Sequence, residues 1–144
     1  MPIFYKDIMT TTIQNKIRII PREIYPDSRG WFLKVINGTE KGLPQFTGEI
    51  YITSAIPSET KGGHYHLKAN EWFTLIKGKC ILKLYDMDEN EYFQIVLEDN
   101  IPQTIFVPHR IAHSFENNSN ENFLLVAYTD MLYDPSDTIK FNFS

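Results

Sequence analysis

Cysteine is almost absent from this chain, since Cys80 is the single one among 144 residues. One thiol cannot form an intramolecular disulfide, and the chain therefore fits a reducing compartment. Long apolar runs are also lacking, because no stretch approaches the roughly 20 residues of a membrane-spanning helix. The first residues have neither the basic nor the apolar region of a signal peptide. We predict a cytoplasmic protein without a membrane partner.

Basic residues are also fewer than acidic residues. The 14 lysines and arginines are outnumbered by 18 aspartates and glutamates, which gives a formal net charge of -4. Proteins that bind nucleic acid need a basic surface, so we expect no nucleic-acid partner. The sequence also lacks a glycine-rich phosphate loop and a dinucleotide-binding fingerprint, so no NAD is implied. A few local cations can still bind a small anionic ligand.

Aromatic residues and short alternating runs are abundant instead. Aromatics make up 14% of the chain, and apolar residues alternate with polar ones in runs too short for long helices. The predicted strands are 17–20, 31–36, 49–56, 72–76, 79–85, 92–97, 104–107, 113–117 and 123–128. Many short strands separated by turn residues predict an all-β sandwich or barrel.

The length fits one domain that spans residues 1–144. Within it, we expect residues 1–12 to form a loose arm or an edge strand exchanged with a second copy. Chains of this kind hide exposed strand edges by closing the barrel or by pairing with another copy. A homodimer is therefore expected.

The histidines fall in two short segments, and their spacing suits a metal site. His64 and His66 are two residues apart, so on a strand both point to the same face. Glu71 and His113 can complete a four-ligand N/O site with open positions, and we expect a divalent metal, with zinc the first choice. The alternative is a set of polar barrel residues that are satisfied by hydrogen bonds.

The two segments resemble the paired motifs of the cupin superfamily. The first motif is matched by His64-x-His66, then Glu71, then Gly78, and the second by Pro108, His113 and Asn117 in register. Arg110 stands where the second motif usually has glycine. The resemblance implies a cupin jelly-roll, also called a double-stranded β-helix.

A narrower resemblance covers most of the chain. The segment 27–32 reads Asp-Ser-Arg-Gly-Trp-Phe and is similar to the opening segment of nucleotide-sugar 3,5-epimerases and 3,4-ketoisomerases. Segment 61–66 parallels their Arg-Gly-x-His-x-(Gln/His), with Lys61 in place of arginine, and Tyr133-x-Pro135 matches their Tyr-x-Pro. Segment 60–73 is closer still to the cupin domain of capsule-sugar reductase/epimerases. The resemblance implies a nucleoside-diphosphate 4-keto-6-deoxyhexose as substrate, His64 as the base and Tyr133 as the opposing acid.

The chemistry of a 4-keto sugar explains why these residue types are needed. The ketone acidifies the neighbouring C–H groups, so epimerisation needs a base on one face, an acid on the other and stabilisation of the enolate. His64 and His66 are the candidate bases, because histidine titrates near neutrality. An imidazole nitrogen bound to a metal cannot accept a proton there, so each is either base or ligand in a given state.

Cations and pocket-lining residues complete the expected site. Arg29 and Lys61, with Arg110 as a further candidate, can bind the diphosphate, although each can equally be a solvated surface charge. Tyr51 can line the pocket, although packing in the core is the favoured interpretation, and Tyr133 is either the acid or a packing residue.

Two other functions compete with the isomerase. One is a metal-dependent cupin oxygenase that uses iron in the same three-histidine, one-glutamate site. The other is a non-catalytic sugar-binding cupin that has kept the barrel.

Overall fold

The computed structural model of this chain describes residues 12–37, 42–43 and 46–144. The arm predicted for residues 1–12 lies outside the described residues, except for Thr12, which begins the short helix α2 (Thr12–Lys16). Elsewhere the described chain is built of antiparallel strands, as the alternation pattern predicted. Within this part of the chain, no helix is long and apolar enough to cross a membrane.

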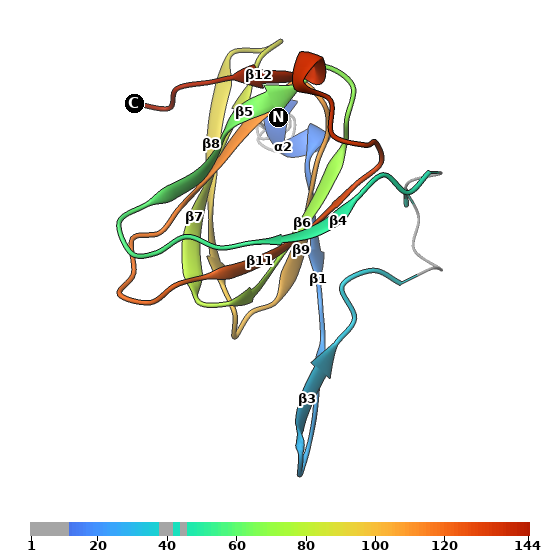
Figure 1. Cartoon of the computed structure of the whole chain (residues 1–144), viewed down its shortest axis with the longest axis vertical. Helices are drawn as coiled ribbons and strands as arrows, with labels where there is room; N and C mark the ends of the chain where they lie inside the picture. The colour runs from blue at the N-terminus through green and yellow to red at the C-terminus, as the bar shows by residue number, and fades with distance from the viewer. Residues whose placement is uncertain (1–11, 38–41, 44–45) are drawn as a thin grey trace, which may run out of the picture.

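Two five-stranded sheets face one another and form the barrel (Figure 1). The first sheet has the order β1 (Arg18–Pro21), β9 (Gln103–Val107), β6 (Glu71–Lys77), β11 (Leu124–Thr129) and β4 (Ile50–Thr53). The second has the order β12 (Thr138–Lys140), β5 (Thr60–His66), β10 (Ile111–Glu116), β7 (Lys79–Asp86) and β8 (Glu91–Glu98).

Strand alternation places one face of each sheet in a common apolar core. On β7, for example, Cys80, Leu82 and Leu84 are fully buried while the residues between them are only partly buried. Cys80 is thus a buried apolar residue. Gly78 joins β6 of one sheet to β7 of the other with a φ of 91°, where a side chain would press on Phe123. This corner needs the left-handed conformation that glycine adopts easily.

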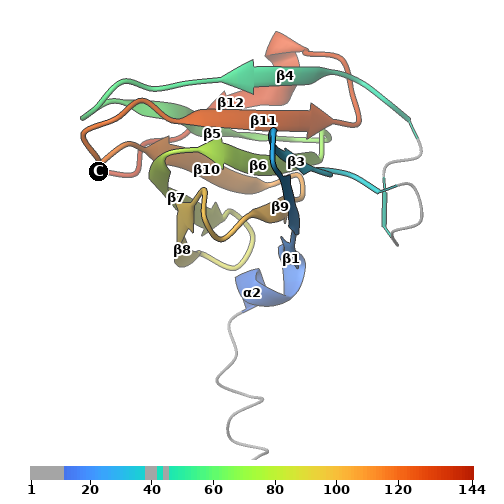
Figure 2. The same ribbon diagram turned by 90° about the horizontal axis from the view of Figure 1, so that it is seen from below.

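Helix α2 closes one side of the core. Ile13 and Ile17 are buried and join the apolar cluster, and Lys16 Nζ lies 2.8 Å from Asp86 Oδ2 at the end of β7. Figure 2 shows this helix immediately before β1, at the outer edge of the barrel. A buried aspartate is costly without partners, so the lysine fastens the helix to the strand.

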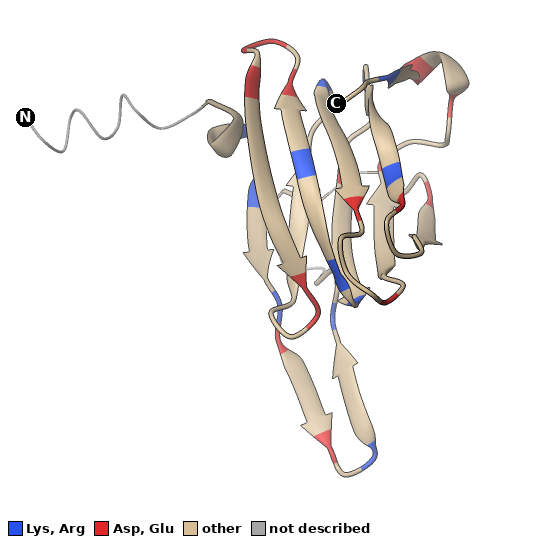
Figure 3. Cartoon of the chain, turned by 90° about the vertical axis from the view of Figure 1, so that its left-hand side faces the viewer, with Lys and Arg blue, Asp and Glu red and all other residues tan. Residues whose placement is uncertain are grey.

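A two-stranded hairpin, β2 (Ile24–Asp27) and β3 (Gly30–Leu33), projects away from the barrel (Figures 1 and 3). Its aromatic side chains are exposed, with Trp31 58% and Phe32 54% accessible. The predicted strand 31–36 corresponds to β3, which ends at Leu33. Strand β2 was not predicted from the sequence pattern.

The sequence pattern also left β5 and β12 out of the predicted strands. The stretch Thr60–His66 carries two glycines and no aliphatic side chain, so apolar alternation gives no signal there. Pairing with β10 on one side and β12 on the other makes it a strand. This strand is the one that carries His64 and His66.

Candidate metal and sugar site

Three histidines and one glutamate converge at one end of the barrel. His64 and His66 come from β5, His113 from the neighbouring β10, and Glu71 is the first residue of β6 in the facing sheet. One ligand atom from each lies within 4.8 Å of the others. The structure thus brings together the four residues that the sequence predicted as metal ligands.

A β-bulge sets the register of the two histidine-bearing strands. His113 pairs with His64, whereas Ser114 pairs with Gly62, so Gly63 is an extra residue in β5. Gly62 and Gly63 both have positive φ angles, 86° and 83°. A Cβ on Gly62 would lie 2.8 Å from the His113 carbonyl oxygen. The two glycines therefore allow β5 to approach β10 closely beside the site.

His66 and His113 each have a partner on the side of the ring that faces away from the cluster. His113 Nδ1 lies 3.2 Å from the carbonyl oxygen of Ile111, an acceptor, so this nitrogen donates and Nε2 keeps its lone pair. His66 Nδ1 faces the Thr138 hydroxyl at 3.3 Å and the Asp137 carboxylate at 3.6 Å. Partners of this kind fix the orientation of metal-binding imidazoles.

Glu71 points a buried oxygen into the centre of the cluster. Its Oε1 lies 2.8 Å from His66 Nε2 and 3.3 Å from His113 Nε2, yet among the described residues it has no hydrogen-bond partner of proper geometry. Its Oε2 accepts a hydrogen bond from the Tyr51 hydroxyl at 3.1 Å. A buried acceptor facing two imidazole nitrogens without hydrogen bonds fits a shared metal ion.

The electrostatics keep Glu71 charged. Burial alone would raise the pKa of this carboxyl, but His113 and His66 beside it hold the pKa well below its usual range.

The electrostatics keep the imidazole of His64 neutral. Its burial, together with the neighbouring His113 and His66, lowers its pKa to about 4. His64 is therefore neutral at pH 7 and can act as a base or as a ligand.

His64 differs from the other two histidines in its surroundings. Its ring packs edge-on against His66 and His113, with centroids 5.1 and 4.9 Å away. In the described part of the chain no hydrogen bond is made by either ring nitrogen of His64, so no outer partner selects its tautomer.

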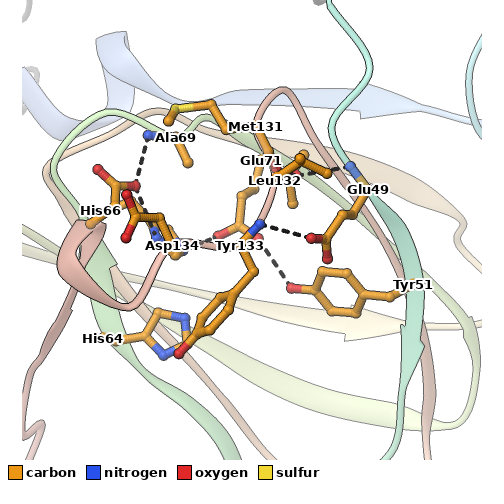
Figure 4. A pocket seen from close by; sticks show the side chains of 12 residues that line it. Glu49, Tyr51, His64, His66, Ala69, Glu71, Met131, Leu132, Tyr133 and Asp134 are labelled. Carbon is orange, nitrogen blue, oxygen red and sulfur yellow. Dashed lines mark hydrogen bonds and ion pairs between the residues drawn. The ribbon is translucent and has the colours of Figure 1, made fainter.

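Two cavities meet at His64 and Tyr51, which line both. The first, here the Tyr133 cavity, has a volume of about 200 Å³ (Figure 4). It is lined by Glu49, Tyr51, His64, His66, Ala69, Glu71, Thr129, Met131, Leu132, Tyr133, Asp134 and Asp137. The second, here the Lys61 cavity, has a volume of about 280 Å³. It is lined by Tyr51, Thr53, Lys61, Gly62, His64, Phe73, His113, Phe115 and Leu125.

The two cavities differ in charge. Four carboxylates line the Tyr133 cavity, namely those of Glu49, Glu71, Asp134 and Asp137. The Lys61 cavity is lined by one lysine and no acidic residue. An anionic group is therefore favoured on the lysine side of His64 and disfavoured on the carboxylate side.

Tyr133, the acid that the Tyr-x-Pro resemblance implied, lines the same cavity as His64, His66 and Glu71. Its side chain is 65% exposed, and Figure 4 shows it directed toward His64. Its backbone N–H donates to Glu49 Oε1 at 2.7 Å. Sequence reasoning missed Glu49, because a glutamate before a strand has no feature that marks it as a partner of a residue 84 positions later.

Two predicted substrate-binding residues lie away from both cavities. Arg29 sits in the turn of the projecting hairpin, where it pairs with Asp27 at 2.8 Å and its side chain is 88% exposed. In Figure 3 the ribbon at this end of the hairpin is coloured for both acidic and basic residues. Arg110 pairs with Asp88 at 2.8 Å and has a φ of 66°, the left-handed conformation that explains the glycine usual at this position.

Asn117, the last residue of the second motif, has a structural role. Its side chain is fully buried, and it donates to the carbonyl oxygens of Ala55 and Glu121. The second motif therefore combines a site residue, His113, with an asparagine that holds the loop after β10.

The fold and the histidine–glutamate cluster define a cupin-type jelly-roll barrel, the predicted fold class. The family model for the polysaccharide biosynthesis C-terminal domain matches residues 25–141. This chain belongs to that family.

The structure is similar to solved structures of sugar-modifying enzymes. A dTDP sugar isomerase from Desulfovibrio desulfuricans superposes with a TM-score of 0.81 at 17% identity, covering 88% of this chain and 83% of that one. A dTDP-6-deoxy-D-glucose-3,5-epimerase from Legionella pneumophila, in complex with dTDP-4-keto-L-rhamnose, also gives 0.81, at 16% identity, with coverage of 93% and 76%. These likenesses confirm the predicted fold.

One sequence relative is a UDP-2-acetamido-2,6-beta-L-arabino-hexul-4-ose reductase from Pseudomonas aeruginosa. It is 22% identical over 111 residues, which are 77% of this chain. The match spans 28% of the length of that protein.

Proposed function

We propose that this chain is an epimerase or ketoisomerase that acts on a nucleoside-diphosphate 4-keto-6-deoxyhexose in the synthesis of a surface polysaccharide. One observation carries the proposal: His64 and Tyr133 line the same cavity as the group of His66, Glu71 and Asp137. A neutral imidazole and a phenol at one cavity are the base and acid that epimerisation requires. The family match and the solved sugar epimerases and isomerases support the same reaction class.

His66, Glu71 and His113 are the proposed metal ligands. Two imidazoles with oriented rings and one carboxylate match the three-ligand set of catalytic zinc sites, which leaves a position open. A divalent ion held there would supply positive charge near the oxygen of the substrate enolate.

His64 is the proposed base. It lies beside the three ligands, it is neutral at pH 7 because its pKa is lowered, and no hydrogen bond from the described residues occupies its ring nitrogens. These properties suit an imidazole that takes the proton from the carbon next to the ketone and loses it to solvent before the next turnover.

Tyr133 is the proposed acid. Donation of its phenolic proton to the face opposite His64 inverts the carbon and gives an epimer. Protonation of the 4-keto oxygen instead gives an enediol, and loss of the proton from the 3-hydroxyl with protonation of C4 then moves the ketone to C3, as in a 3,4-ketoisomerase. The same residues serve both outcomes, so the position of the substrate in the cavity decides between them.

The charge of the two cavities supports one orientation of the substrate. The uncharged keto sugar lies among the carboxylates and the histidines, while the diphosphate extends toward Lys61, away from the carboxylates of the Tyr133 cavity. Phosphate oxygens and an ammonium group attract each other strongly where water is scarce.

The projecting hairpin supports a homodimer. Arg29 is exposed and lines neither cavity of its own chain, and Trp31 and Phe32 expose large apolar surfaces next to it. Ile50 and Ile52 on edge strand β4 are each 64% exposed as well. A second copy that covers these surfaces would also bring Arg29 to a substrate, as its predicted role requires.

The test is proton NMR in deuterated water with the zinc-loaded protein and a panel of dTDP- and UDP-linked 4-keto-6-deoxyhexoses. Deuterium at C3 alone with the ketone still at C4 indicates a 3-epimerase, whereas a product ketone at C3 with deuterium at C4 indicates a 3,4-ketoisomerase. Deuterium at C3 and C5 indicates a 3,5-epimerase. Tight binding without exchange of any sugar would contradict the proposal and favour a sugar-binding cupin, and oxygen uptake with iron would favour an oxygenase.

A further inference from the structure

Asp137 is a buried carboxylate, 6% exposed, whose bonds go to the loop between two proposed metal ligands. Its Oδ1 accepts from the backbone N–H of Lys68 at 2.8 Å, and its Oδ2 accepts from that of Ala69 at 3.2 Å. Its main-chain oxygen accepts from the N–H of Leu67 at 3.0 Å. Three successive residues of the connection from His66 to Glu71 are thus held by one aspartate.

The same carboxylate faces the outer side of the His66 ring. Asp137 Oδ2 lies 3.6 Å from His66 Nδ1, and the hydroxyl of Thr138, the next residue, lies 3.3 Å from that nitrogen. On the inner side of the ring, Nε2 lies 2.8 Å from Glu71 Oε1. The ring is therefore held from outside while its other nitrogen points into the cluster.

Asp137 also belongs to the segment that carries Tyr133. It ends the short helix η1 (Pro135–Asp137), and its N–H donates to the carbonyl oxygen of Asp134 at 3.0 Å. The anchored residue is thus four positions from Tyr133, on the wall of the same cavity. A displacement of Asp137 would move the ligand loop and the Tyr133 segment together.

We propose that Asp137, with the Thr138 hydroxyl, is a positioning residue that sets the separation and orientation of His66 and Glu71 as metal ligands. The inference rests on the metal site of the proposed function. An aspartate is needed because both of its oxygens accept from adjacent N–H groups. An asparagine of nearly the same size has one acceptor oxygen and would turn an NH₂ group toward an N–H donor.

The experiment compares Asp137→Asn with the unaltered protein in two measurements on the folded chain. The first is zinc affinity, measured by competition with a chromophoric chelator, and the second is the visible absorption spectrum of the cobalt(II)-loaded protein. We expect zinc affinity to fall by about 10- to 100-fold, the usual cost of losing an outer partner of a metal ligand. The cobalt bands should also change in position and intensity.

Asp99→Asn is the matched control. Asp99 also accepts a backbone hydrogen bond, from Gly78 N at 2.8 Å, but it lies at the corner between β6 and β7 and lines neither cavity of the site. This variant should keep the zinc affinity and the cobalt spectrum of the unaltered protein. Because the cobalt bands report the geometry of the ligands and not the stability of the fold, bands that change only in Asp137→Asn place the effect at the metal site.

If Asp137→Asn does not fold, Thr138→Val tests the same imidazole, because it removes the hydroxyl that faces His66 Nδ1. The proposal expects altered cobalt bands in this variant. The proposal is overturned if Asp137→Asn keeps the zinc affinity and the cobalt bands of the protein without substitutions. If only Thr138→Val folds, the proposal is overturned when that variant keeps those bands. It is also overturned if the protein without substitutions binds no zinc. A protein that binds zinc and responds to these changes but exchanges no sugar proton would leave this inference standing and refute the proposed function.

Discussion

The end of the barrel that holds the histidine–glutamate cluster and the β2–β3 hairpin were both marked by short motifs, yet they are built differently. At the barrel end, facing sheets place four side chains within 4.8 Å, and backbone or hydroxyl groups orient two of the rings. In the hairpin, Arg29 contacts Asp27 two residues away, and the aromatic residues beside it are exposed.

The cluster at the barrel end is thus a site whose side chains all come from one chain, whereas the surface of the hairpin is exposed in a single chain. Buried polar groups usually have partners, and the outer partners of His66 and His113 orient these two rings within a single chain. An exposed hairpin with apolar side chains gains partners only from outside the chain. We therefore expect barrel-end substitutions to act on metal binding and catalysis, and hairpin substitutions to act on substrate affinity and association.

The largest effect on zinc binding is expected for Glu71→Gln. This change removes the charge that faces two imidazole nitrogens, so zinc affinity should fall by more than the roughly 100-fold typical of an outer partner. Glu49→Gln is the control, because Glu49 lines the same cavity but its contact is to Tyr133 N. Equal zinc affinity of the two variants by chelator competition would show that Glu71 is not a ligand.

The next effect is expected for Tyr133→Phe. Removal of the phenolic proton should slow epimerisation by about 100-fold, within the usual range for a general acid, while zinc stays bound. Proton exchange at the sugar carbon should persist, because His64 still removes the proton. NMR in deuterated water measures both rates, and an unchanged epimerisation rate would remove Tyr133 from the mechanism.

A smaller effect on stability should distinguish the two bulge glycines. Both have φ angles above 80°, so alanine at either position should cost about 1–2 kcal/mol from the left-handed conformation. At Gly62 the new methyl would lie 2.8 Å from the His113 carbonyl oxygen, which is a clash, whereas at Gly63 the nearest atom, the Phe141 carbonyl oxygen, lies at an ordinary contact distance of 3.5 Å. Gly62→Ala should therefore unfold at lower denaturant concentration than Gly63→Ala, and equal midpoints would refute the close contact.

The smallest effect is expected for Arg29→Ala on the hairpin. Loss of one charge-assisted contact to phosphate should raise KM by about tenfold with little change in kcat, provided that two copies associate. Lys34→Ala, which changes another cation near the hairpin, serves as the control in the same steady-state assay. An unchanged KM for Arg29→Ala would show that Arg29 is a solvated surface charge that does not contact the substrate.

The sequence predicted the barrel end better than the hairpin for a physical reason. The spacing of His64 and His66 determines a shared face as soon as the segment is a strand, and His113 joins them by strand pairing. Asp137 gave no such signal, because its partners are N–H groups of residues 68 and 69, which any residue type supplies. Arg29 was recognised by its motif, but a motif does not tell where a projecting hairpin finds its ligand.

His64 is proposed as the base and not as a metal ligand, so the decisive measurement combines zinc content and sugar-proton exchange in His64→Ala. We predict that this variant keeps one zinc ion per chain, because His66, Glu71 and His113 remain. Deuterium exchange at the sugar should fall by about 1,000-fold, because the base is gone. Loss of zinc together with activity would make His64 a ligand, and retention of full exchange would contradict its role as the base.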